Sequence, residues 1–133
     1  GINNQSDLEQ STLSATSPSA RVLFFFDRAD KTGIKNPEYL TAIAEKIKQG
    51  NVSQTIHLTG YTDRLGSVNY NQNLSAARAN TVAKILVEQG IDPNQIQIEA
   101  KSETNAYQQC SGENRKIRLV ECLAPNRRVN ITW

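Results

Sequence analysis

The chain has few of the residues that catalytic and metal sites use most often: its 133 residues include one histidine and two cysteines. A structural zinc site needs four ligands, usually closely paired cysteines and histidines, which His57, Cys110 and Cys122 do not supply. The sequence also contains no glycine-rich phosphate loop and no G-x-S-x-G nucleophile elbow. We therefore expect a non-enzymatic protein with no metal and no cofactor.

Long apolar runs and an excess of one charge are also missing. The longest apolar run near the start, residues 22–26, is far shorter than the roughly 20 residues that span a bilayer. The net charge of +2 is too small to indicate a nucleic-acid partner. The first residues lack the basic and apolar regions of a signal peptide, which leaves a cytosolic protein and a piece of an exported protein both open.

The two cysteines are twelve positions apart (122 − 110 = 12). A disulfide that closes this loop would stabilise the fold by about 3 kcal/mol and would indicate an oxidising compartment. Two free thiols in a cytosolic protein are the alternative, and the spacing leaves both open. A catalytic cysteine is not expected, because His57 is the only imidazole and lies in a predicted strand, on the face opposite its apolar residues.

Polar residues dominate the start of the chain, so we predict a linker or tail over residues 1–20 and one domain over 21–133. Apolar runs and alternation predict four strands, at 22–26, 55–61, 95–100 and 128–133. Helical spacing and end signals predict three helices, at 37–49 with Asn36 as its cap, at 70–89 and at 113–123.

The resulting order, β-α-β-α-β-α-β, predicts an α/β (α+β) sandwich in which the helices pack on a small, mixed, four-stranded sheet. We expect the run 22–26 to be covered on both faces and Ile96 and Ile98 to point inward. The long helix is expected to bury a stripe made of Leu74, Ala77, Thr81, Ile85 and Leu86.

A candidate ligand site lies where the second predicted strand ends. Gly60-Tyr61-Thr62-Asp63 opens a loop there, and the loop runs into the start of the long helix, whose N–H groups favour an anion. Asp63 can receive an ammonium while Arg78 takes a carboxylate, so the pair suits a zwitterion. A structural Asp63–Arg78 ion pair, in which Asp63 also bonds loop amides, is the alternative, and the spacing leaves both open.

Basic residues crowd the last twenty positions, a pattern most typical of a solvated face. These residues are Arg115, Lys116, Arg118, Arg127 and Arg128.

Several of these motifs resemble one known family. Gly60-Tyr61-Thr62-Asp63, Gly66, Asn71, Leu74-Ser75 and Arg78-Ala79 resemble the signature G-[HY]-T-D-x-x-G…N-x-x-L-S-x-x-R-A of OmpA-like peptidoglycan-binding domains. Phe26-Asp27 resembles the family's F-D step, and Asn126-Arg127-Arg128-Val129 its closing N-R-R-V. The resemblance extends from Val22 to Trp133. Cys110 and Cys122 look like the disulfide loop of the enterobacterial outer-membrane-protein-A branch, so a disulfide is implied.

The resemblance implies non-covalent binding to the peptide stem of peptidoglycan at meso-diaminopimelate, whose side chain ends in an ammonium and a carboxylate. By motif position, Asp63 and Arg78 hold the two charges, Arg127 adds a second guanidinium, Asp27, Thr62 and Asn71 line the groove, and Leu74 forms an apolar wall. Such a module works in the periplasm of a Gram-negative bacterium, where it tethers a membrane-anchored parent protein to the cell wall. A homodimer is among the oligomeric states left open.

One stretch departs from the family pattern. Where relatives commonly have G-x-G-E-x-x-P, this chain reads Ala100-Lys101-Ser102-Glu103-Thr104-Asn105-Ala106. That loop borders the groove in relatives. The alternative function is therefore a protein–protein scaffold that keeps the fold and has lost wall binding. A wall hydrolase is a third class, but the sequence offers neither an acid–base pair nor a metal for it.

Overall fold

The computed structural model describes residues 19–50 and 54–133, so residues 1–18 of the predicted linker lie outside the described part. The strands are β1 (Ser19–Leu23), β2 (Ile56–Thr62), β3 (Ile96–Glu103) and β4 (Arg128–Thr132). The α-helices are α1 (Glu38–Gln49), α2 (Val68–Glu88) and α3 (Lys116–Cys122). The predicted order and the mixed four-stranded sheet are confirmed, and β1 begins two residues before the expected domain start.

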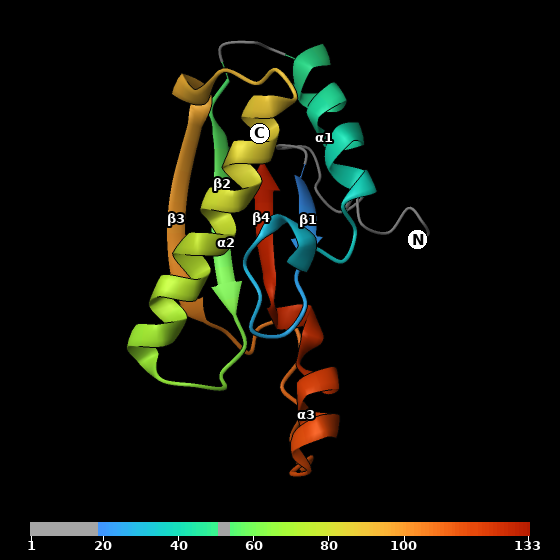
Figure 1. Ribbon diagram of the computed structural model, residues 1–133, viewed down its shortest axis with the longest axis vertical. Helices are drawn as coiled ribbons and strands as arrows, with labels where there is room; N and C mark the ends of the chain where they lie inside the picture. The colour runs from blue at the N-terminus through green and yellow to red at the C-terminus, as the bar shows by residue number, and fades with distance from the viewer. Residues whose placement is uncertain (1–18, 51–53) are drawn as a thin grey trace.

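The last strand of the chain lies inside the sheet. The strand order is β1-β4-β2-β3, with β4 antiparallel to both β1 and β2, while β2 and β3 are parallel. As Figure 1 shows, this insertion brings the segment that precedes β4 to the end of the sheet at which β1 and β2 terminate. Residues far apart in sequence therefore meet at one end of the sheet.

Helices α1 and α2 cover one face of the sheet, and α3 extends beyond its end (Figure 1). The core between these layers is apolar and almost fully buried; it includes Val22, Phe24, Leu40, Ile43, Leu58, Val82, Leu86, Val129 and Ile131. Gly60 lets α2 approach β2 closely, because a Cβ at this position would lie 2.1 Å from the backbone oxygen of Ser75.

The expectation that residues 22–26 are covered on both faces is wrong. Strand β1 ends at Leu23 and is an edge strand with one covered face, so Val22 and Phe24 are buried while Phe25 and Phe26 are 46% and 39% exposed. A short apolar run cannot by itself distinguish an edge strand from a central one. The same reason applies to Ile98, which is 42% exposed on the other edge strand, β3.

Two helix details also differ from expectation. Asn36 does not cap α1; its side chain instead accepts a hydrogen bond from the backbone N–H of Leu23, at 3.1 Å. Helix α2 begins at Val68 after the cap residue Ser67. Its buried face includes polar residues near the start of the helix, and Ala77, which we expected on that face, is exposed. The buried residues of α2 are Asn71, Ser75, Arg78, Ala79, Val82, Ile85 and Leu86.

Candidate functional site

A single groove lies at the end of the sheet where β2 runs into α2. Its walls come from the loop after β1, the turn between β2 and α2, the first turns of α2, the start of α3 and the residue before β4. The lining residues are Phe26, Asp27, Thr62, Asp63, Leu65, Gly66, Tyr70, Asn71, Leu74, Arg78, Lys116 and Arg127. All seven residues that the sequence nominated as ligand contacts therefore line one groove.

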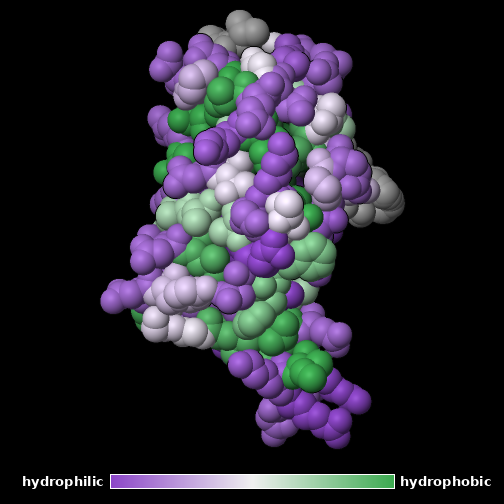
Figure 2. All heavy atoms as spheres, viewed as in Figure 1, coloured by the Kyte–Doolittle hydropathy of each residue, from purple (hydrophilic) through white to green (hydrophobic). Residues whose placement is uncertain are grey.

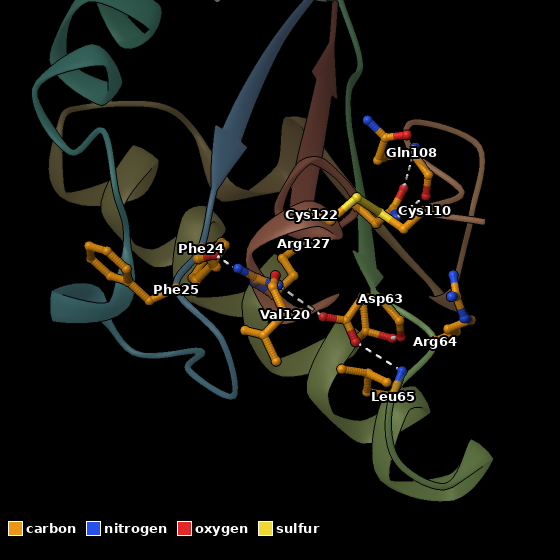
Figure 3. A network of polar contacts seen from close by, with 12 residues as sticks. Phe24, Phe25, Asp63, Arg64, Leu65, Gln108, Cys110, Val120, Cys122 and Arg127 are labelled. Carbon is orange, nitrogen blue, oxygen red and sulfur yellow. Dashed lines mark hydrogen bonds and ion pairs between the residues drawn. A yellow bond between two sulfur atoms is a disulfide. The ribbon is translucent and has the colours of Figure 1, made fainter. Parts of the chain in front are cut away.

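Asp63 directly follows β2 and is 3% exposed. One carboxylate oxygen accepts the backbone N–H of Leu65 at 3.0 Å, and the other accepts Nη1 of Arg127, also at 3.0 Å (Figure 3). The structural ion pair considered from the sequence thus exists with a different partner: Asp63 pairs with Arg127 and not with Arg78. The insertion of β4 beside β2 is what brings Arg127 to this position.

Arg127 connects three parts of the fold. Besides Asp63, its Nη1 donates to the carbonyl of Val120 at 2.8 Å, and its Nε donates to the carbonyl of Phe24 at 3.3 Å (Figure 3). Its guanidinium also lies 5.6 Å from the ring centre of Phe26. The end of β1, helix α3 and the loop after β2 are consequently held by one buried side chain.

Arg78 is fully buried, yet it also lines the groove. Its guanidinium donates only to backbone carbonyls: Nε to Arg28 at 2.8 Å, Nη1 to Tyr61 at 3.0 Å and Nη2 to Phe25 at 3.3 Å. Within residues 19–50 and 54–133 it forms no ion pair. Burial and the nearby charge of Arg127 lower the pKa of Arg78 to about 10, so it stays protonated at neutral pH.

Asp27 and Tyr70 face each other across the exposed side of the groove. The Tyr70 hydroxyl donates to the carboxylate of Asp27, and this bond raises the pKa of Tyr70. Asp27 has a φ of 60°, in the left-handed region that aspartate tolerates better than most residues. Its carboxylate is thereby presented at the opening of the groove.

The turn between β2 and α2 is shaped by two of the predicted site residues. Asn71 donates its side-chain amide to the carbonyl of Leu65 at 3.0 Å, and the hydroxyl of Thr62 donates to the carbonyl of Asp63 at 2.8 Å. Gly66 supplies the left-handed φ of +98° that the turn requires. Thr62 and Asn71 are each 1% exposed, so they shape the turn, and half-buried Leu74 contributes apolar surface.

The disulfide between Cys110 and Cys122 is confirmed and closes the segment that contains α3 (Figure 3). Asn126 fastens the same segment, because its side chain accepts from Tyr107 and Gln108 and donates to the carbonyl of Gln108. This segment carries Lys116 to the groove.

The sequence-based site did not include five lining residues: Phe26, Leu65, Gly66, Tyr70 and Lys116. Lys116 had one available signal. It belongs to the basic cluster inside the disulfide loop, only eleven positions before Arg127 (127 − 116 = 11). Tyr70 belongs to no motif that we identified, and its position depends on where α2 begins.

Residues 100–106, where the family pattern is broken, do not line the groove. Strand β3 continues to Glu103, and Ser102 takes a left-handed φ of 64° where relatives have glycine. The stretch contacts the site at its edge: the backbone N–H of Thr104 donates to the carbonyl of Thr62 at 3.0 Å, and Arg64 donates to the side chain of Asn105 at 3.0 Å and to the carbonyl of Gln109 at 2.8 Å. The departure from the family thus lies outside the groove itself.

Among residues 19–50 and 54–133, no group of three or more histidine, cysteine, aspartate or glutamate residues is placed to hold a metal ion. No helix in the same ranges has the length and apolar character needed to cross a membrane.

Known proteins similar in sequence agree with the motif. The family model described as "OmpA family" matches residues 25–118. Outer membrane protein A of Escherichia fergusonii is 35% identical over 116 residues, which cover 83% of this chain and 46% of that protein. Outer membrane protein A of Shimwellia blattae is 43% identical over 74 residues, covering 54% and 31%. The chain thus spans less than half the length of these relatives.

Solved structures share the fold. The OmpA-like domain of FopA1 from Francisella tularensis has a TM-score of 0.66 at 22% identity, covering 88% of this chain and 71% of that one. The peptidoglycan-associated lipoprotein of Burkholderia pseudomallei has a TM-score of 0.67 at 22% identity, covering 85% and 89%. The cell wall anchor of the T6SS from Pseudomonas aeruginosa has a TM-score of 0.63 at 26% identity, covering 90% and 83%.

Proposed function

This chain belongs to the OmpA family, and from that premise and the geometry of the groove we propose that it binds the peptide stem of peptidoglycan at meso-diaminopimelate. The binding is non-covalent and non-catalytic. The module works in the periplasm of a Gram-negative bacterium and tethers a membrane-anchored parent protein to the cell wall. Relatives named as a peptidoglycan-associated lipoprotein and as a cell wall anchor support this role.

The observation that carries the proposal is Arg78, a buried guanidinium in the groove whose three bonds all go to carbonyls. A cation in a largely desolvated site attracts a carboxylate more strongly than it would in water. Because the three carbonyls fix the planar guanidinium in one orientation, little order remains to be imposed when the ligand binds. Arg78 therefore receives the carboxylate at the end of the diaminopimelate side chain.

The ammonium on the same carbon needs an acceptor nearby. Asp63 keeps acceptor capacity beyond its bonds to Leu65 and Arg127, because an ionised carboxylate offers about four lone-pair positions. Asp27 offers a second carboxylate at the opening, bonded to the hydroxyl of Tyr70. Leu74 and Phe26 supply apolar surface for the methylene chain of the ligand.

The scaffold alternative depended on the altered stretch from Ala100 to Ala106. Since none of those residues lines the groove, their substitution leaves the nominated ligand contacts in place. The geometry therefore favours wall binding. Whether the module works as a monomer or a homodimer is a separate question that sedimentation of the purified domain can answer.

The most discriminating experiment compares two stem peptides by calorimetric titration. One contains meso-diaminopimelate, and the other contains L-lysine, which lacks only the terminal carboxylate of that side chain. Losing one partner of a desolvated charge pair costs about 2–5 kcal/mol, so we expect at least about thirtyfold weaker binding of the lysine peptide. Equal affinity for the two peptides would refute the role given to Arg78.

The matching protein variant must respect the burial of Arg78. Arg78→Ala would leave three carbonyls without this donor and should therefore destabilise the fold as well as weaken binding. Arg78→Lys keeps the charge but loses the planar fork, and we expect at least about tenfold weaker binding of the diaminopimelate peptide. Lys46→Gln, on the exposed side of α1, is the control and should bind as the parent does. Circular dichroism and thermal unfolding establish that each variant is folded.

A further inference from the structure

The charged residues of the groove do not balance. Five of its lining residues are charged: Asp27, Asp63, Arg78, Lys116 and Arg127. Three of them are cations and two are carboxylates, so the groove has one cation in excess even though Asp63 and Arg127 form a buried ion pair. A diaminopimelate side chain ends in one ammonium, which the carboxylates of Asp63 and Asp27 accept, and one carboxylate, which Arg78 receives. It therefore adds no net charge and leaves Lys116 without a counter-charge.

Lys116 is available for such a ligand. Its side chain is exposed, and it forms no ion pair or hydrogen bond with any other residue in ranges 19–50 and 54–133. Figure 2 shows that most side chains at the protruding end of the molecule formed by α3 are hydrophilic, with one hydrophobic patch among them. Within this basic segment Lys116 lines the groove, whereas Arg115 and Arg118 do not.

The backbone around Lys116 is fixed relative to the buried pair. The disulfide joins Cys122, the last residue of α3, to Cys110, which precedes the helix, and the carbonyl of Val120 accepts a hydrogen bond from Nη1 of Arg127 at 2.8 Å. The arginine that pairs with Asp63 therefore also positions the helix that carries Lys116. Because the helix is fixed, the flexible side chain of Lys116 can reach a carboxylate that lies at a roughly constant distance from the end of the bound diaminopimelate side chain.

We propose that Lys116 forms a subsite for a second carboxylate of the same ligand, adding a contact outside the diaminopimelate side chain. This inference rests on the proposed function. In a stem tripeptide, two carboxylates outside the side-chain end have the required chemistry: the α-carboxylate of D-glutamate and the carboxylate at the C-terminus. Both are the same kind of group for a lysine ammonium, so the test must separate them.

The test uses three synthetic tripeptides, L-alanyl-γ-D-glutamyl-meso-diaminopimelate and its two monoamides, at the D-glutamate α-carboxylate or the C-terminus. Each is titrated into the parent protein, Lys116→Gln and the control Arg118→Gln, which lies on the same helix outside the groove. The parent protein and the control should bind one monoamide about fivefold more weakly than the unmodified peptide. Lys116→Gln should bind the unmodified peptide about fivefold more weakly than the parent does and should not distinguish it from that monoamide. The effect should decrease with added salt, because the contact is exposed.

The outcomes separate the two proposals. If the parent protein binds the unmodified peptide and Lys116→Gln keeps the parent's affinity and preference, the second-carboxylate subsite is refuted while the proposed function stands. Equal binding of all three peptides by the parent protein also refutes the subsite. If the parent protein binds none of the three peptides, the proposed function fails and the subsite fails with it.

Discussion

The floor and the rim of the groove are built in different ways. We define the floor as Asp63, Arg78 and Arg127, which are at most 4% exposed and have two or three partners each within the protein. The rim consists of Asp27, Tyr70 and Lys116, which are exposed. In the rim, Asp27 bonds to Tyr70, and Lys116 has no polar partner among the described residues. The floor is therefore organised by folding itself, while the rim keeps side chains that can adjust to a ligand.

This difference assigns distinct tasks to the two regions. A site whose charges are already oriented loses little entropy when a ligand binds, which favours a high and specific affinity. Exposed charges contribute less affinity per contact, but they affect association rates and respond to salt. Variants of the floor should therefore change folding and binding together, whereas variants of the rim should change binding almost alone.

The largest expected effect comes from breaking the floor. Arg127→Leu leaves the carboxylate of Asp63 buried without its cation and removes the donor from the carbonyls of Phe24 and Val120. Losing one partner of a buried pair costs about 3–5 kcal/mol, so the free energy of unfolding at pH 7 should fall by that amount in urea titrations.

The matched control for the floor is Lys116→Gln in the rim, which should change the unfolding free energy by less than about 0.5 kcal/mol. A double-mutant cycle tests the cause: Asp63→Asn should cost less in the Arg127→Leu background than in the parent, because no cation remains to be lost. Additive effects of the two substitutions would contradict a coupled pair.

The residues of this floor also show what a sequence can and cannot reveal. The strand, turn and helix from Ile56 to Glu88 were predicted to within two residues at either end, because alternation, the turn and helical spacing are local signals. The partner of Asp63 was not predicted. That pairing depends on β4 lying between β1 and β2, and a contact across 64 positions leaves no periodic signal.

The disulfide supports the segment that carries the rim residue Lys116, and its removal gives the next largest effect. Replacing Cys110 and Cys122 with alanine should lower the unfolding free energy by about 3 kcal/mol, because the unfolded chain is no longer constrained by the closed loop. Amide hydrogen exchange should become faster in α3, which carries Lys116, while the buried half of α2 changes little under native conditions. Equal acceleration in both helices would show that α3 is not a separate, disulfide-supported unit.

Ser102 offers a smaller effect of the opposite sign, outside the groove. It takes a left-handed φ of 64°, and its buried hydroxyl oxygen has no hydrogen-bond partner within the described residues. Ser102→Gly should remove both penalties at some entropic cost in the unfolded chain and stabilise the protein by about 1 kcal/mol in urea titrations. Affinity for the diaminopimelate peptide should not change, because the residue does not line the groove. Lower stability would contradict the two penalties assigned to Ser102. Altered affinity would indicate that the departure from the family pattern affects the site.

The smallest effect concerns the loop behind the rim. Asp30 accepts two bonds from the guanidinium of Arg28 and one from Thr32, and these contacts lower the pKa of Asp30 to about 2. A carboxylate with a depressed pKa in the folded state stabilises the protein fully above its usual pKa of about 3.8, and this contribution is lost as the pH falls through about 2. The stability difference between the parent and Asp30→Asn should therefore be constant from pH 7 to about pH 5 and shrink toward zero near pH 2. A carboxyl NMR titration gives the midpoint directly, and Arg28→Gln should move it upward. Arg28 directly follows Asp27, and the carbonyl of Arg28 accepts a hydrogen bond from Nε of Arg78. A titration midpoint of Asp30 near its usual pKa would mean that the contact with Arg28 does not support this loop. The bond to Arg78 in the floor would then hold the loop alone.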